Sequence, residues 1–307
     1  MVAVDGRYIF IGFEVFIAIG CCLGNLLVIW AVWKSGALNQ PTFCLIVSLA
    51  MADFLVGCVV VPLSVVEAFK VEMSFHVCLF ISCFLIVPLQ ASVFTLLAIA
   101  LDRYLRVCIP FRYKSIVTKR RSWVLAAVCW MLACLLGFLP MYGWYKPHTL
   151  KRHNSTLKCE FTDVISLSYL VNFIFFGIFI PLLAIMVAFY CYIFFKVRWL
   201  KGKTGIAESA AYNRKEHKLA GSLVLVLALF VACWLPLHIM HAINFFSFPI
   251  KQVPSDVIYF GVIVSHVNSV VNPVVYALRI PKIKEEFRKI WRSLIGPQQQ
   301  TTESLEI

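Results

Sequence analysis

Five polar side chains interrupt long apolar stretches of this sequence, and their types suit the binding of a small cation. They are Asn25, Asp53, Ser92, Asn268 and Asn272. A polar group in an apolar segment is costly unless it finds partners, so we expect these five to face one another. Carboxylate, hydroxyl and amide oxygens are the ligands that hard cations take. The set therefore predicts a sodium site or a structural hydrogen-bond network, and the two roles are compatible.

A second group of charged residues has the arrangement of a switch. Asp102, Arg103 and Tyr104 stand together where one apolar stretch ends, and Glu216 stands where a later one begins. A contact between Arg103 and Glu216 would hold two helix ends together, and its loss would let them separate. The alternative is that Arg103 only anchors its own helix at the membrane surface.

Two prolines lie inside apolar stretches that are long enough to form helices. Pro236 ends the run Cys-Trp-Leu-Pro, and Pro273 is the second residue of Asn-Pro-Val-Val-Tyr, which ends at Tyr276. Proline removes a backbone hydrogen bond and kinks a helix. We expect both helices to bend there, so that movement at one end displaces the other.

The elements that position these residues must be membrane-spanning helices. The 307 residues are 61% hydrophobic and 14% charged, which is outside the range of a soluble domain of this length. A spanning helix needs about 20 mostly apolar residues. We therefore predict an all-α membrane protein, a seven-transmembrane helix bundle in one domain (1–294). The predicted spans are 8–33, 42–67, 75–107, 122–144, 167–197, 218–246 and 255–278. The sequence has neither a nucleophile–base constellation nor metal-ligand spacing, so we do not expect an enzyme.

The distribution of lysine and arginine predicts the orientation of this bundle. The loops after the first, third and fifth spans and the C-terminal tail hold 21 of the 28. Because the basic side is cytoplasmic, we place the chain in the plasma membrane with its N-terminus extracellular. Attraction to the anionic inner leaflet then explains the net charge of +13 without a nucleic-acid partner.

The segment after the seventh span has the pattern of a helix that lies on membrane lipid. Apolar residues recur at helical spacing among basic ones at 282–294. This predicts a short amphipathic cytoplasmic helix, followed by a short polar cytoplasmic tail at 295–307.

The predicted orientation places two cysteines and a glycosylation sequence outside the cell. Cys78 is near the outer end of the third span, and Cys159 is in the loop after the fourth. Oxidising conditions there favour a disulfide between them. Asn154 begins Asn-Ser-Thr in the same loop and is a candidate glycosylation site.

Together these features resemble the class A, or rhodopsin-like, G-protein-coupled receptors. The motifs that carry the resemblance span the chain: Gly-Asn at 24–25, SLAMAD ending at Asp53, DRY at 102–104, CWLP at 233–236, NPVVY at 272–276 and the outer cysteine pair. The runs CLFISCF (78–84), LLAIALDRYLRV (96–107), CWLPLHI (233–239) and SHVNSVVNP (265–273) are most similar to adenosine receptors. DRYLRV followed by IPFRYK is closest to the inhibitory-coupled members. The resemblance implies a small-molecule ligand, a heterotrimeric G protein as partner, and an allosteric sodium ion as the one bound cofactor.

The resemblance also implies a set of ligand-contacting residues. Ser265 and His266 match positions that contact the ribose, and Glu14 on the first helix matches the polar partner of His266. Phe161 matches a loop aromatic that stacks on adenine, and Trp234 matches the residue beneath the ligand that is implicated in activation. The matched wall positions are Leu237 and His238.

Several positions depart from the adenosine-receptor pattern. His241 replaces an asparagine that hydrogen-bonds the adenine, and Thr162 replaces a glutamate beside the stacking aromatic. Leu89 replaces a threonine near the ribose, and Ile174 occupies a position that is usually polar. Glu160 would share the side of Thr162 in an extended segment, so it is a candidate replacement. A site built on hydrogen bonds loses strongly when a partner is removed, so we expect altered nucleoside recognition. His241 either makes binding pH-dependent or only lines the mouth of the site.

Three functions fit these observations to different degrees. The first is a receptor for extracellular adenosine or a related purine nucleoside, with inhibitory coupling to adenylate cyclase favoured. The second is an orphan-type receptor of the same class for a more apolar ligand, as Leu89 and Ile174 suggest. A transporter or channel is a remote third, because the sequence has no paired half-helices or inverted repeats.

Overall fold

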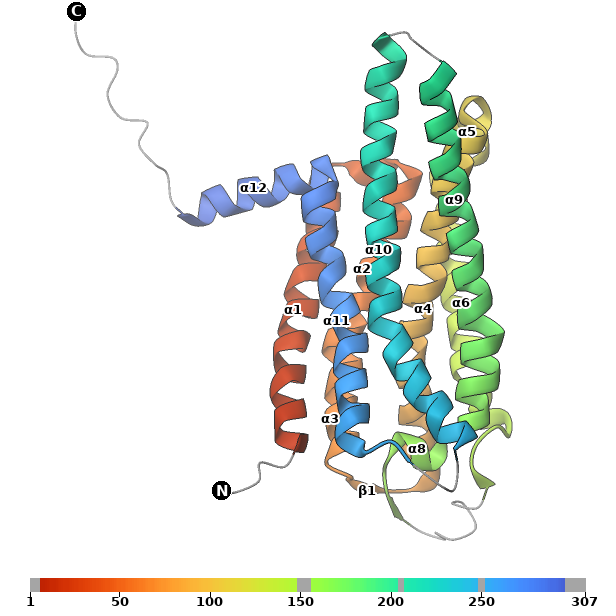
Figure 1. Cartoon of the computed structure of the whole chain (residues 1–307). Helices are drawn as coiled ribbons and strands as arrows, with labels where there is room; N and C mark the ends of the chain where they lie inside the picture. The colour runs from red at the N-terminus through yellow and green to blue at the C-terminus, as the bar shows by residue number, and fades with distance from the viewer. Residues whose placement is uncertain (1–5, 148–155, 204–206, 248–251, 296–307) are drawn as a thin grey trace, which may run out of the picture.

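The computed structural model describes residues 6–147, 156–203, 207–247 and 252–295, and within these ranges the protein is a bundle of long helices (Figure 1). Seven helical segments there are long and apolar enough to cross a membrane. They are Gly6–Lys34, Pro41–Ala68, Phe75–Cys108, Lys119–Gly137, Tyr169–Lys196, Leu227–Phe246 and Ser255–Arg279. The predicted seven-helix fold class is confirmed.

The long helices are joined by short connections. In chain order the spanning segments and the last helix consist of α1 (Gly6–Lys34), α2 (Pro41–Leu55), η2 (Val56–Val60), α3 (Val61–Ala68), α4 (Phe75–Cys108), α6 (Lys119–Gly137), η4 (Tyr169–Phe179), α9 (Ile180–Lys203), α10 (Ala207–Phe246), α11 (Ser255–Arg279) and α12 (Pro281–Ile295). The short elements are η1 (Ala37–Asn39), β1 (Glu72–Met73), α5 (Pro110–Ile116), η3 (Leu139–Tyr142), β2 (Leu157–Lys158) and α8 (Phe161–Val164).

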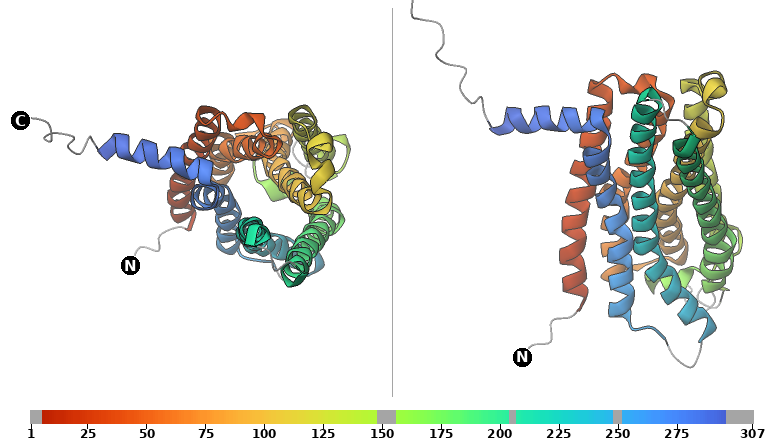
Figure 2. Two further views of the ribbon diagram at one scale, coloured as in Figure 1. Left: turned by 90° about the horizontal axis from the view of Figure 1, so that it is seen from above. Right: turned by 45° about the horizontal axis from the view of Figure 1, so that its top comes forward.

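Apolar side chains cover the outside of the bundle as well as its interior. Seen along the bundle axis, the spanning helices form a ring (Figure 2), and the faces that meet inside are closely packed, as at Leu49 and Phe230. Yet large apolar side chains such as Phe16, Leu135 and Phe195 are well exposed on the outer surface. Hydrocarbon solvates such a surface and water does not, so the packing is that of a membrane protein.

Two of the spanning helices are widened locally, and three of the long helical elements have a proline in their interior. The segments η2 and η4 are π-helical, a wider turn that is common at functional sites. A Cβ at Gly57 in η2 would lie 2.6 Å from Cβ of Cys21, so glycine is needed for α1 to pack this closely. Pro88, Pro236 and Pro273 lie inside α4, α10 and α11. Figure 1 shows α10 changing direction along its length, as the proline predicts.

The two ends of the bundle are built differently. At the end where α1 begins, β1 pairs with β2 in an antiparallel ladder, Glu72 opposite Lys158, and α8 lies beside them (Figure 1). At the other end, α12 packs against α1 and α11 and projects outward from the side of the bundle, roughly perpendicular to its axis (Figures 1 and 2). Ile283 on α12 is fully buried, whereas Trp291 is exposed. This helix corresponds to the amphipathic helix predicted at 282–294.

Several predicted boundaries were wrong. The fourth span ends at Gly137 and not at residue 144, because η3 and the left-handed Gly143 (φ 116°) carry the chain away from the helix axis. The second span is not one regular helix, since η2 divides it. The sixth helix begins at Ala207 and not at 218, since a helix extends beyond the bilayer without needing apolar residues. The short elements α5 and β1 were not predicted. Asn154 and the tail at 296–307 lie outside the described residues.

Candidate functional site

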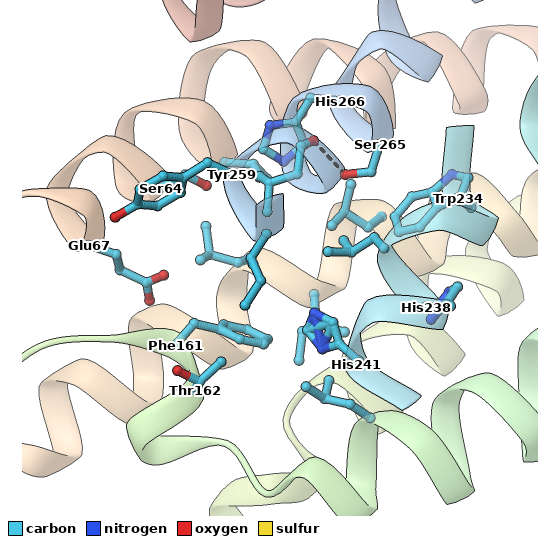
Figure 3. Close-up of a pocket in the computed structure, with 18 of the residues that line it drawn as sticks. Ser64, Glu67, Phe161, Thr162, Trp234, His238, His241, Tyr259, Ser265 and His266 are labelled. Atoms are coloured by element: carbon cyan, nitrogen blue, oxygen red, sulfur yellow. Dashed lines mark hydrogen bonds between the residues drawn. The ribbon is translucent and has the colours of Figure 1, made fainter. Parts of the chain in front are cut away.

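A cavity lies inside the end of the bundle that carries β1 and α8. Its volume is about 240 Å³, and α3, α4, η4, α10, α11 and the segment around α8 enclose it. All but one of the ligand-contacting residues named from the sequence line it (Figure 3): Leu89, Phe161, Thr162, Ile174, Trp234, Leu237, His238, His241, Ser265 and His266. The exception is Glu14, which lies behind His266. Ten of the eleven positions named from the sequence therefore line one cavity, together with further residues that the sequence did not identify.

A buried pair fixes one wall of the cavity. Both carboxylate oxygens of Glu14 on α1 lie 3.0 Å from Nδ1 of His266 on α11. Glu14 is fully buried, and His266 is 2% exposed. With Nδ1 donating to the carboxylate, Nε2 is the ring nitrogen left for a ligand, as an acceptor in the neutral ring or a donor in the protonated ring. Glu14 thus orients His266 without lining the cavity.

Stacked rings form the inner part of the cavity. The His238 ring is stacked on Phe175 of η4, with centroids 5.0 Å apart, and on Trp234, with centroids 5.9 Å apart. Phe179 lies at 4.7 Å from the same ring. Trp234 is buried, and its indole nitrogen has no hydrogen-bond partner among the described residues. A ligand that presses on this stack would contact both η4 and α10.

The replaced positions all face the cavity. Leu89 and Ile174 line it and present no polar atom, so they cannot take over the hydrogen bonds of the polar residues they replace. His241 lies across the cavity from Phe161 (Figure 3) and makes no hydrogen bond within the part of the chain that the structure describes. Its ring nitrogens are therefore available to a ligand.

Glu160, the candidate replacement for the missing glutamate, is engaged elsewhere. It lines the cavity but forms an ion pair with Lys70, at the end of the second span. The hydrogen bond from Lys70 to Glu160 raises the pKa of Lys70 above its usual value. Both residues of the pair line the cavity, and the pairing leaves less of the Glu160 charge for a ligand.

Sequence reasoning missed several polar residues of the cavity. Ser64 and Glu67 of α3, Gln90 of α4 and Tyr259 of α11 also line it. Ser64 and Glu67 are three residues apart and therefore share a helix face. That spacing, in a segment (α3) that is otherwise apolar, was the signal that could have identified these two residues.

The predicted cation cluster is a compact hydrogen-bonded network around Asp53. Its Oδ1 accepts hydrogen bonds from Ser269 (2.8 Å) and Ser92 (3.3 Å), and its Oδ2 accepts one from the Asn272 amide (2.7 Å). Asn25 donates to the backbone oxygen of Ser269 at 3.0 Å. These hydrogen bonds join α1, α2, α4 and α11 at the same depth in the bundle.

Two details of this network differ from the prediction. Ser269, which was not predicted, makes the shorter hydroxyl contact to Asp53, whereas Asn268 is buried but makes no hydrogen bond to Asp53 in the described structure. Asn25 Oδ1 is buried and has no hydrogen-bond partner among the described residues. Carboxylate, hydroxyl and amide oxygens thus stand close together, with one of them unsatisfied, and this is a donor set that fits a small hard cation.

At the opposite end of the bundle, Asp102 is held by hydroxyl groups. Its carboxylate accepts a hydrogen bond from Tyr113 of α5 at 2.6 Å and one from Thr42 of α2 at 2.8 Å. Arg106 donates to the same two hydroxyls, each at 3.1 Å. Burial and the Asp102 carboxylate raise the pKa of the Tyr113 hydroxyl, so it remains a donor at physiological pH. The described partners of Asp102 therefore come from neighbouring elements, and Tyr113 is a partner that the sequence did not reveal.

The other switch residues lie on the helices where they were predicted. Tyr104 stacks on Phe189 of α9, with centroids 4.7 Å apart. Tyr276 is buried, and its hydroxyl has no hydrogen-bond partner among the residues described. Glu216 belongs to α10, but its side chain lies outside the described residues, so the contact between Arg103 and Glu216 stays a prediction.

The predicted disulfide is present. Cys78 at the start of α4 is bonded to Cys159, which follows β2. The bond ties the segment before α8 to the bundle, directly beside Glu160 and Phe161. It therefore fixes the part of the loop that reaches the cavity.

Comparison with known proteins finds similarity along almost the whole chain. A family model described as "7 transmembrane receptor (rhodopsin family)" matches residues 24–276. Adenosine receptor A3 of Ovis aries is 41% identical over 289 residues, covering 93% of this chain and 90% of that protein. Adenosine receptor A3 of Canis lupus familiaris is 40% identical over 288 residues, with 92% and 91% covered. The protein of the same name from Bos taurus is 40% identical over 289 residues, with 93% and 90% covered.

Proposed function

The chain belongs to the rhodopsin family of seven-transmembrane receptors, and from this we propose that it binds extracellular adenosine or a closely related purine nucleoside and signals through heterotrimeric G proteins. As a member of this family it is a multi-pass membrane receptor and not an enzyme. Its relatives named adenosine receptor A3 support the choice of ligand. We place the cavity and the N-terminus outside the cell, because the basic residues gather at the opposite end of the bundle.

One observation carries the proposal: a single cavity combines an aromatic side chain with a polar wall held in place from behind. Phe161 offers a flat face to a nucleobase. Ser265 and His266 offer hydrogen bonds to a sugar, and Glu14 holds the His266 ring. A purine nucleoside has these two halves, one flat and one rich in hydroxyl groups. The cavity therefore matches both halves of this ligand class.

Signalling follows from the position of the cavity on α10. Leu237, His238 and His241 all lie beyond Pro236, on the cavity side of the bend. A ligand that favours one position of this part of α10 also favours one position of the rest of the helix. Movement of the cytoplasmic end of α10 away from α4 would open a surface for a G protein. From the DRYLRV sequence we favour inhibitory coupling to adenylate cyclase.

Two further partners belong to the proposal. We propose that α12 rests on the lipid of the inner leaflet, since its basic residues flank Phe287 and Trp291. We also propose a sodium ion at Asp53, held with the hydroxyls of Ser92 and Ser269 and the amide oxygen of Asn25. Bound there, the ion would supply positive charge that favours one arrangement of α1, α2, α4 and α11.

A more apolar ligand is the second candidate function. Leu89 and Ile174 bring apolar surface into the cavity where hydrogen bonds are expected of a nucleoside site. Loss of a buried hydrogen bond costs about 1–3 kcal/mol, equivalent to about 5- to 150-fold in affinity. Such a loss weakens nucleoside binding without abolishing it, so the nucleoside remains the first candidate.

The two candidates are separated by a signalling assay. The full chain is expressed in cells, adenosine and inosine are applied, and cAMP is followed in both directions. The wild type is compared with a His241→Asn, Leu89→Thr double variant, which restores two polar contacts. His76→Asn is the matched control, because His76 is exposed and does not line the cavity. We expect a response in the wild type and a more sensitive one in the double variant. If both are expressed and neither responds, the nucleoside proposal is wrong.

A further inference from the structure

Glu67 is an acidic side chain of the cavity to which neither the family resemblance nor the proposed function gives a role. It is the penultimate residue of α3, and its carboxylate faces the cavity beside Phe161 (Figure 3). Ser82 of α4 donates a hydrogen bond to its Oε1 at 2.8 Å. No other hydrogen bond to this carboxylate occurs in the described ranges, so Oε2 has no donor among the described residues.

No ion pair to Glu67 occurs among the residues that the structure describes. Lys70, one turn further along the chain, is paired with Glu160. Glu160 also lines the cavity, so the nearest loop residue adds negative and not positive charge. Ser82 supplies only a neutral hydroxyl. A carboxylate inside a helix bundle is costly unless it is paired and hydrogen-bonded, and here one oxygen is left for a partner from within the cavity.

A purely structural role accounts for only half of this geometry. The bond from Ser82 fastens α3 to α4, and one acceptor oxygen is enough for that. A glutamine would give the same bond without the cost of a buried charge. The second oxygen and the charge are explained by a ligand that brings a hydrogen-bond donor.

We propose that Glu67 Oε2 accepts a hydrogen bond from an exocyclic amino group of the ligand's base, and that this contact sets the specificity of the cavity. The inference rests on the proposed nucleoside function and deepens it. A base stacked on Phe161 has its edge beside Glu67, while the sugar reaches Ser265 and His266. An amino group satisfies the carboxylate, whereas a base without one leaves it unpaired. Glu67 therefore replaces the acceptor that is lost at Thr162.

A panel of ribosides tests the proposal on the purified full-length receptor. Purine riboside has no exocyclic amino group, adenosine has one at C6, 2-aminopurine riboside has one at C2, and 2,6-diaminopurine riboside has both. The affinity of each is obtained from the dependence of the thermal-unfolding midpoint on ligand concentration. The variants are Glu67→Gln, Glu67→Asp and, as the matched control, Glu72→Gln. Glu72 is an exposed acid on β1 that does not line the cavity.

We expect wild type to bind at least one amino-bearing riboside about tenfold or more tightly than purine riboside, as a charge-assisted hydrogen bond gives. Glu67→Gln should reduce this preference to less than about threefold while leaving the binding of purine riboside unchanged. Glu67→Asp, which keeps the charge but is one methylene shorter, should also reduce it, and Glu72→Gln should match wild type. The aspartate variant provides the same test if the glutamine variant does not fold.

Two results would overturn the inference and leave the proposed function intact. One is a wild type that binds all four ribosides without preference. The other is a Glu67→Gln variant that keeps the wild-type preference. A wild type whose unfolding midpoint responds to none of the ribosides would overturn the proposed function itself, and the inference with it. The two failures are therefore distinguishable in one data set.

Discussion

Replacing Glu14 by glutamine tests whether a residue outside the cavity controls ligand affinity. Glu14 does not line the cavity, and both of its carboxylate oxygens lie 3.0 Å from Nδ1 of His266. Glutamine has the same shape and keeps one acceptor oxygen, but it removes the charge and turns the other oxygen into a donor. Any effect on the ligand must therefore pass through the position and protonation of the His266 ring.

The expected size of the effect follows from the type of hydrogen bond that is lost. A hydrogen bond to a charged group contributes about 1.5–3 kcal/mol, and a neutral one about 0.5–1.5 kcal/mol. Glu14→Gln replaces a hydrogen bond to a charged group by a neutral hydrogen bond, which loses about 1–1.5 kcal/mol. This loss corresponds to roughly tenfold weaker nucleoside binding. Glu14→Ala leaves His266 without its partner, and binding should weaken by roughly 10- to 150-fold.

The assay is the same concentration-dependent thermal-unfolding measurement with adenosine, made on wild type, Glu14→Gln, His266→Ala and the double variant. If Glu14 acts only through His266, then Glu14→Gln has no further effect on affinity once His266 is alanine. Glu72→Gln serves as the control for the loss of an acidic group elsewhere on the same side. The reasoning is refuted if Glu14→Gln binds adenosine as wild type does, or if its effect is the same with and without His266.

Three further predictions concern other parts of the structure. Tyr113→Phe removes the hydroxyl at 2.6 Å from Asp102. If this bond is made only in the resting state, we expect the fraction of receptor in the active state to rise about tenfold, which is seen as altered basal cAMP. An unchanged basal cAMP level in a well-expressed variant would contradict this. Lys70→Gln breaks the exposed pair with Glu160 and should lower Tm by no more than about 3 °C. Because the pKa of Lys70 is raised, the contribution of this ion pair to stability is complete below the usual lysine pKa and is lost only as pH rises through the higher pKa of the folded state. The difference in Tm between wild type and Lys70→Gln should therefore be equal at pH 7 and pH 9. A smaller difference at pH 9 would contradict the pairing. Asp53→Asn should abolish any difference in adenosine affinity between sodium chloride and choline chloride buffers, and a difference that persists would rule out a sodium ion at this residue.

The spanning helices could be predicted from the sequence because each is set by a local property. About 20 apolar residues are needed to cross a bilayer, and the polar residues inside such a stretch must turn inward. Asp53, Ser92 and Asn272 were identified on that basis, and the structure brings them together. Ser269 was missed because a lone serine in a helix satisfies its hydroxyl on its own backbone as readily as on a neighbour. Only the packing of α11 against α2 decides whether the Ser269 hydroxyl bonds to its own backbone or to Asp53.

The contacts of Asp102 could not be predicted for a different reason. Tyr113 belongs to α5, a short helix in a loop whose sequence is basic and polar, and no apolar periodicity marks it. Its hydroxyl reaches Asp102 because α5 packs against α4. Glu67 was overlooked in a similar way, since an acid near the end of a span is usually solvated at the membrane surface. In both cases the function of the side chain depends on the direction in which its element leaves the membrane.

The geometry of α10 allows the cavity to differ from that of the adenosine receptors while the signalling end stays the same. The helix continues for about 15 Å from Pro236 to Phe246 on the cavity side and for about 44 Å from Pro236 to Ala207 on the other, at 1.5 Å per residue. If the two arms turn together about the bend, a small displacement at the cavity becomes roughly three times as large at the far end. Any ligand that moves the short arm can therefore drive the long one, whatever groups it uses to bind. We therefore propose that His241, Leu89 and Glu67 determine which molecule binds, and that Pro236 and the Asp102 network determine what binding does.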